Sequence, residues 1–140
     1  MHRTPDLDTP IQTYLATPST IQIRLPANAC DTHVHVFGPV ARFPYSDSRI
    51  FTPVEAPKEK LFALHQLMGI DRCVIVQSMI HGLDNAVVAD AIAAGQGCYL
   101  GVALVPVDIS SDALRGLANQ GFRAVRFNFM KHLEIGRAHV

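Results

Sequence analysis

The sequence predicts an α/β fold built around a parallel β-sheet. Short, mostly apolar segments alternate with segments of helical periodicity in the order β, α, β, α, β, α, β. Nearly continuous apolar strands are typical of parallel sheets that helices cover. The strands recur at intervals of roughly 25 to 40 residues, which suits a (β/α)8 barrel or a doubly wound sheet. Periodicity alone does not choose between these two.

Composition indicates one compact domain. The chain has 140 residues, of which 49% are hydrophobic and 17% charged, and its 12 basic side chains balance its 12 acidic ones. This neutral charge, without a basic run, argues against binding to nucleic acid or to acidic membranes. We find no signal peptide and no apolar run of about 18 residues. The odd number of cysteines (Cys30, Cys73 and Cys98) predicts reduced, buried thiols in a cytoplasmic protein.

Residues 1–27 are expected to form an extended N-terminal arm. Prolines at positions 5, 10, 18 and 26 disfavour a helix or a central strand, and only residues 21–25 resemble a short edge strand. The folded part is predicted over residues 28–133. It opens with a core strand over 29–37 and a long proline-containing loop over 38–56.

Three helices separate the remaining strands. Pro57 is expected to open the first helix and Gly69 to end it, since these residues suit those positions. Leucines at 61, 64 and 67 mark its apolar side. Strands are predicted over residues 72–78, 99–105 and 122–130, with the second helix capped by Asp84 and the third by Ser110 or Ser111.

The last seven residues, 134–140, do not continue this pattern. They read EIGRAHV, which is what a common sequencing-library adapter encodes in this frame. We therefore expect an artefactual tail after Leu133, with a natural polar tail as the alternative. A (β/α)8 barrel needs roughly 200 residues or more. This chain supplies four strands and three helices, which is fewer than a complete barrel contains.

Two histidines lie one residue apart at the end of the first strand, in ACDTHVHVFGP over residues 29–39. Side chains at i and i+2 share a face of a strand, so we expect Asp31, His33 and His35 on one side of the sheet. Both candidate folds place their sites at the carboxyl ends of strands. Two imidazoles there could bind one divalent ion, such as zinc, together with later ligands. The alternative is a pair of core histidines satisfied by hydrogen bonds.

The fourth strand predicts a second polar group at that edge. Residues 125–129 read VRFNF, which puts Arg126 and Asn128 on one face and apolar side chains on the other. An enclosed guanidinium needs an anion or several acceptors, and its geometry suits a carboxylate. The alternative is an internal salt bridge with a residue such as Asp31.

Taken together, these segments resemble the amidohydrolase-related proteins, and within them the 2-pyrone-4,6-dicarboxylate hydrolase group of lactonases. The resemblance covers residues 25–133 and rests on CDTHVHVFGP, FPYS at 43–46, CVIVQ and HGLDN within 73–85, and RFNFMKHL at 126–133. It implies a (β/α)8 barrel, of which this chain is the N-terminal half, and hydrolysis of a lactone or a similar ester-like bond.

The resemblance also implies roles for three residues. His33 and His35 fall on first-strand histidines that bind a metal in many amidohydrolases. In the pyrone-dicarboxylate lactonases these histidines are thought to contact the substrate directly, so both a divalent metal and a metal-independent mechanism remain open. Arg126 falls on an arginine that binds a substrate carboxylate.

Three positions depart from the pattern of the pyrone-dicarboxylate lactonases. Phe51 stands where a substrate-binding tyrosine is expected, Met79 replaces a small serine, and His132 replaces a second carboxylate-binding arginine. An imidazole is a weaker anion partner than a guanidinium. We therefore expect another lactone or carboxylated cyclic compound as the substrate.

The catalytic base is expected on strands that this chain lacks, so the chain by itself should be inactive and prone to self-association. The rival functions are a metal-dependent decarboxylase of the same superfamily and a non-catalytic binding or assembly module. Of the other histidines, His65 is expected on the surface of its helix. His81 is expected beside the site or solvated in a loop.

Overall fold

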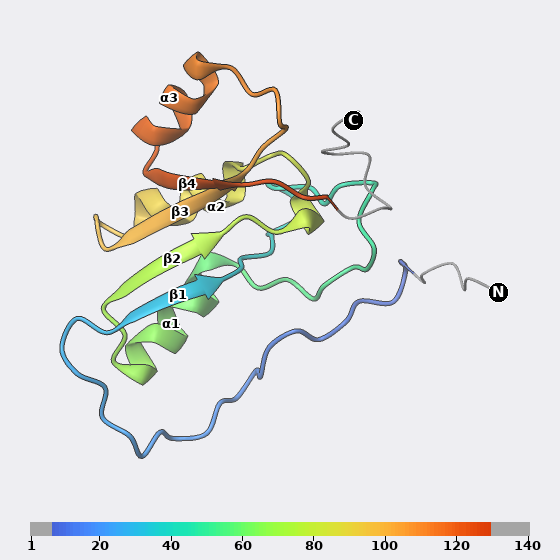
Figure 1. Cartoon of the computed structure of the whole chain (residues 1–140). Coiled ribbons are helices and arrows are strands. Elements are labelled where there is room, and N and C mark those ends of the chain that lie inside the picture. The colour runs from blue at the N-terminus through green and yellow to red at the C-terminus, as the bar shows by residue number, and fades with distance from the viewer. Residues whose placement is uncertain (1–6, 130–140) are drawn as a thin grey trace.

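The computed structural model of this chain describes residues 7–129, and within them one four-stranded parallel sheet (Figure 1). Its elements are β1 (Cys30–Val34), α1 (Lys58–Met68), β2 (Arg72–Val76), the 3-10 turn η1 (Met79–His81), α2 (Ala86–Ala94), β3 (Tyr99–Leu104), α3 (Ser111–Asn119) and β4 (Phe122–Arg126). The predicted order of strands and helices is confirmed, although each strand is shorter than expected.

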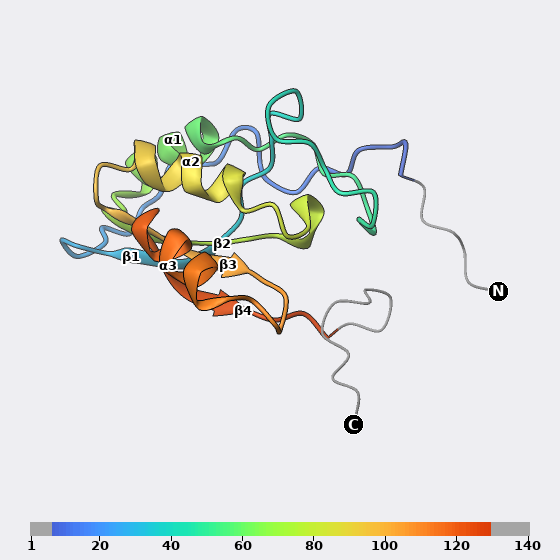
Figure 2. The ribbon, with the colours of Figure 1, turned by 90° about the horizontal axis from the view of Figure 1, so that it is seen from above.

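The winding of the sheet is that of a (β/α)8 barrel. The strands are adjacent in the order β1-β2-β3-β4, without the reversal of order that a doubly wound sheet contains. Helices α1 and α2 lie on one side of the sheet, which we call the helical face, and α3 lies beside β4 (Figure 2). On the other side, the open face, Leu100 is 38% exposed. The described chain thus forms four consecutive strand positions of a barrel.

The core lies between the helical face and α2. Every second residue of the central strands points there, as Cys73, Ile75 and Ala103 do, and each of the three is at most 1% exposed. A Cβ atom added at Gly101 would lie 2.6 Å from Cδ1 of Ile92 and 2.7 Å from Cδ1 of Phe122. The close approach of α2 to β3 therefore depends on glycine at this position.

The helix ends follow the predicted residues closely. Pro57 precedes α1, and Gly69 ends it in the left-handed conformation at φ 68°. The Ser110 side chain accepts a hydrogen bond from the backbone N–H of Ala113, which caps α3. Asp84 accepts from the backbone N–H of Ala86, although the residue at the cap of α2 is Asn85.

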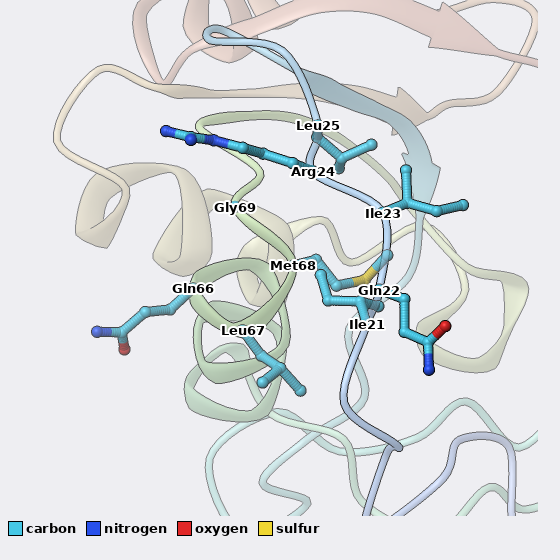
Figure 3. Close-up of a pocket in the computed structure, with 9 residues that line it drawn as sticks. All are labelled: Ile21, Gln22, Ile23, Arg24, Leu25, Gln66, Leu67, Met68 and Gly69. Carbon is cyan, nitrogen blue, oxygen red and sulfur yellow. The ribbon is translucent and has the colours of Figure 1, made fainter.

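The arm departs from expectation because residues 21–25 form no strand. The earlier part of the arm is hydrogen-bonded to the long loop instead. The N–H of Ile11 donates to the carbonyl of Thr52 at 2.8 Å, and the N–H of Val54 donates to the carbonyl of Ile11 at 2.9 Å. Residues 21–25 line an open depression with residues 66–69 at the end of α1 (Figure 3). That depression lies at the edge where the strands begin.

Three further expectations are wrong. His65 is 1% exposed rather than on the surface, because α1 is rotated so that Leu61 and His65 face the sheet. The leucines at 64 and 67 are exposed. Of the cysteines, only Cys73 is buried, since Cys30 and Cys98 lie at the start of β1 and just before β3. No helix within residues 7–129 is long and apolar enough to cross a membrane.

Candidate active site

The candidate site lies at the carboxyl end of β1. The imidazole rings of His33 and His35 are edge to face, with centroids 5.2 Å apart, and both residues are exposed. Between them, Val34 pairs with the fully buried Ile75 of β2 and so faces the helices. Because neighbouring residues of a strand project to opposite sides, both histidines belong to the open face.

The expectation that Asp31 shares this face is wrong. The pairing of β1 with β2 shifts between Asp31 and Val34, as at a β-bulge. Asp31 pairs with Cys73, which is buried against the helices, and its carboxylate reaches His65 of α1 at 3.4 Å. Strict alternation of side chains along β1 predicts Asp31 on the same face as His33. The bulge interrupts this alternation and turns Asp31 to the helical face.

The ring of His35 is oriented by the end of the neighbouring strand. Its Nδ1 atom lies 2.7 Å from the carbonyl oxygen of Val76. A carbonyl only accepts, so Nδ1 carries the proton, and Nε2 of the neutral ring keeps its lone pair. Although the residue as a whole is exposed, partial burial of its ring lowers the pKa of His35; the hydrogen bond to Val76 opposes this shift, and the charges of His33 and Arg126 add to it. His35 is therefore a neutral acceptor at neutral pH.

Arg126 lies at the end of β4 and reaches across the sheet. Its guanidinium donates from NH1 to the backbone carbonyl oxygen of Gln77 at 3.3 Å, next to the carbonyl of Val76 that His35 contacts, so both groups lie at the carboxyl end of β2. The proposed salt bridge with Asp31 does not form. The remaining N–H groups of this half-buried guanidinium are suited to a carboxylate.

The other predicted substrate-binding residues have different positions. The Sδ atom of Met79 accepts a hydrogen bond from the amide of Asn128, two residues beyond Arg126, so Met79 lies at the rim of the site. Phe51 is half-buried in the long loop and makes no hydrogen bond or ring contact with His33 or His35. His132 lies outside the described residues.

His81 is a structural residue rather than a solvated one. It is 4% exposed, its Nε2 accepts from the backbone N–H of Gly38 at 3.3 Å, and its Nδ1 donates to the carbonyl of Pro44 at 3.1 Å. Burial lowers its pKa against the effect of that carbonyl. Tyr45 packs edge-on against the ring at 5.1 Å. His81 thereby fixes the long loop beside the end of β1.

Gln77 is a site residue that the sequence reasoning missed. It is fully buried at the end of β2, and its amide donates to the carbonyls of Gly82 at 3.3 Å and Asp84 at 2.8 Å. The side chain of Gln77 thereby holds the η1 turn in place. The backbone carbonyl of Gln77 accepts the hydrogen bond from Arg126. The one signal was a glutamine that ends an apolar run.

The described residues do not complete a metal centre. His35 offers a lone pair and His33 is exposed, but a catalytic zinc site takes three protein ligands. Within residues 7–129, no group of three His, Cys, Asp or Glu side chains could hold an ion. Arg126 adds a positive charge to this region, which disfavours a cation there.

Comparisons with known proteins find similar sequences. The model of the family described as Amidohydrolase matches residues 30–137. A 2-pyrone-4,6-dicarboxylate hydrolase from Comamonas testosteroni is 45% identical over 86% of this chain and 39% of its own length. A 4-sulfomuconolactone hydrolase from Rhizobium radiobacter is 40% identical over 86% of this chain and 40% of its own. The chain thus spans about 40% of these relatives' length.

Solved structures share the fold. A probable 2-pyrone-4,6-dicarboxylic acid hydrolase from Acinetobacter baumannii, with citric acid bound, has a TM-score of 0.67 at 26% identity, over 72% of this chain and 38% of that one. A protein from Agrobacterium tumefaciens has a TM-score of 0.68 at 22% identity, over 79% of this chain and 40% of that one, and supports the fold alone.

Proposed function

Because this chain belongs to the amidohydrolase family, we propose that the protein that carries it hydrolyses the ester bond of a small carboxylated lactone. One observation carries the proposal: His35 and the guanidinium of Arg126 contact the carbonyls of consecutive residues, Val76 and Gln77, at the carboxyl end of β2. Imidazoles and a fixed cation at such an edge suit an anionic substrate with an electrophilic carbonyl. Both relatives are named as hydrolases of acidic compounds.

In this proposal Arg126 orients the substrate. One N–H of its guanidinium is held by the carbonyl of Gln77, which fixes the plane of the fork and leaves its other donors for a carboxylate. A bidentate contact of this kind determines which carbon of the substrate faces the histidines. The citric acid bound to the Acinetobacter baumannii structure is itself a carboxylated ligand.

The two histidines have different roles in the proposed reaction. His33, whose ring contacts that of His35 edge to face, donates an N–H to the substrate carbonyl and stabilises the oxyanion as it forms. His35 cannot do so while neutral, because its only N–H is directed at Val76. Its Nε2 lone pair instead accepts a hydrogen bond from the attacking water.

The proton of that water goes to a stronger base. The lowered pKa of His35 makes it a weak proton acceptor, and a general base works best with a pKa near the operating pH. We place this base on a strand that follows the residues described here. The chain by itself is then inactive.

The test is hydrolysis of a lactone panel by the complete protein, followed by base consumption at constant pH. Carboxylated or sulfonated lactones should be opened and their uncharged analogues should not. Arg126→Gln should raise KM for the acidic lactones by about 10-fold to 100-fold, which corresponds to the about 1.5–3 kcal/mol of a charged hydrogen bond.

Arg72→Gln is the matched control. Arg72 also donates its guanidinium to a backbone carbonyl, that of Asn28, but at the opposite edge of the sheet. If both variants change KM equally, or if no lactone is turned over, the proposed function is wrong.

A further inference from the structure

A buried polar network lies behind the site, on the helical face. Nδ1 of His65 in α1 is 2.7 Å from the hydroxyl of Tyr99 in β3, and its Nε2 is 3.4 Å from Oδ2 of Asp31 in β1. His65 is 1% exposed and Tyr99 8%. Three elements far apart in sequence are therefore joined by one imidazole inside the hydrophobic core.

The partners fix the direction of each hydrogen bond. A carboxylate only accepts, so Nε2 of His65 carries the proton that faces Asp31. In the tautomer with its single proton on Nε2, Nδ1 then accepts from the hydroxyl of Tyr99. Burial raises the pKa of Tyr99 to about 12, which keeps the phenol protonated for this bond. The three side chains form a directed chain from Tyr99 through His65 to Asp31.

The second oxygen of Asp31 connects this network to the candidate site. Oδ1 accepts from the backbone N–H of His33 at 3.2 Å, while Oδ2 faces His65. The two bonds lie at the register shift of β1, where Asp31 turns to the helical face and His33 to the open face. The carboxylate of Asp31 thus forms a hydrogen bond with the backbone of His33, whose side chain lies on the opposite face of the sheet.

We propose that Asp31, His65 and Tyr99 are positioning residues, which hold the bulge of β1 so that His33 and His35 face the substrate. This inference rests on the proposed function for its consequence in catalysis, but not for its geometry. A polar imidazole inside a core costs free energy unless it is paired, so His65, which is 1% exposed, needs the 33% exposed carboxylate of Asp31 as a partner. The network supplies that partner and makes the conformation of β1 depend on α1 and β3.

The experiment compares variants of the complete protein by the NMR signals of the His33 and His35 rings and by kcat/KM for an acidic lactone. Asp31→Ala removes both bonds, and we expect it to shift both ring signals and to lower kcat/KM on the order of 10²-fold, the effect of a misplacement of about 1 Å. Asp31→Asn keeps an acceptor for the N–H of His33 and should restore most of the activity.

Tyr99→Phe tests the same network in case Asp31→Ala does not fold. It removes only the hydroxyl and keeps the ring that packs edge-on against Phe62 at 5.1 Å. We expect it to shift the His33 and His35 signals in the same direction as Asp31→Ala, by a smaller amount. Unchanged signals in this folded variant would overturn the proposal.

Asp90→Asn is the matched control, because Asp90 of α2 is also a paired carboxylate of the helical layer, bound to Lys58 at 2.6 Å. It should lower the melting temperature and leave both ring signals unchanged. If Asp31→Ala behaves in the same way, Asp31 has a role in stability only and the proposal is wrong. If the parent opens no lactone, the proposed function fails, while the ring signals still decide on positioning.

Discussion

The protonation of His81 should make the stability of the fold depend on pH. Nε2 of this ring accepts from the N–H of Gly38, so a proton added to Nε2 faces another donor and breaks that bond. The pKa of His81 is lowered in the folded state from the ordinary value of 6.5. Between the lowered value and 6.5 the unfolded chain binds more protons, so stability rises with pH and is lost as pH falls.

The expected loss can be worked from the contacts. A buried donor left without its partner costs about 1–3 kcal/mol, but one proton can lower the free energy of unfolding by at most about 1.4 kcal/mol for each pH unit below 6.5. We therefore expect a loss of about 1–2 kcal/mol from about pH 8 to about pH 5 because of His81. His81→Gln should remove that contribution, since an amide offers one acceptor to Gly38 and one donor to Pro44 and does not titrate. The measurement is urea unfolding of parent and variant at both pH values.

Tyr45→Phe is the control from the same cluster. It keeps the ring beside His81 and loses the hydroxyl that donates to the carbonyl of Pro53 at 3.4 Å. Because the pKa of Tyr45 is raised to about 12, the control should lose the same free energy at both pH values. If His81→Gln keeps the full pH dependence of the parent, the assigned hydrogen bonds of His81 are wrong.

Four further predictions follow from the site and the packing. Removal of divalent metals from the complete protein with a chelator should leave lactone hydrolysis unchanged, as measured by base consumption, because the proposed mechanism takes oxyanion stabilisation from His33 and carboxylate binding from Arg126; loss of activity on chelation would contradict it. His35→Phe should lower kcat more than it raises KM in steady-state kinetics, since it removes the acceptor for water. Gly101→Ala should lower the free energy of unfolding by about 1–3 kcal/mol in urea unfolding, because the added methyl group meets Ile92 and Phe122. The 140-residue chain should sediment as a dimer or larger species, because within the described residues β1 and β4 each leave one edge unpaired; a monomer would contradict this.

The order of elements was predictable because each boundary has a local cause. Pro57, Gly69 and Ser110 act through their own backbone conformation or a hydrogen bond within one turn, so the sequence alone locates them. The choice between barrel and doubly wound sheet was not predictable from periodicity, because both folds use the same strand–helix unit. It was the family resemblance that indicated the barrel.

The candidate site was predicted in part. The strand period predicted His33, His35 and Arg126 at one edge; the two rings are in contact there, and Arg126 reaches the carbonyl next to the one that His35 contacts. The same period failed for Asp31, because a bulge depends on pairing with another strand and leaves no mark in a single segment. The burial of His65 was missed for a related reason: its partners come from β1 and β3, more than 30 positions away.

The neighbour-by-neighbour order of the strands has a consequence for synthesis of the protein. Within residues 7–129, each strand pairs only with the strand made just before it or just after it. A nascent chain can therefore add each β–α unit to a surface that already exists, and no late segment has to insert between two earlier ones. Ribosome-bound chains that end after β2, β3 or β4 should resist protease over progressively longer N-terminal segments.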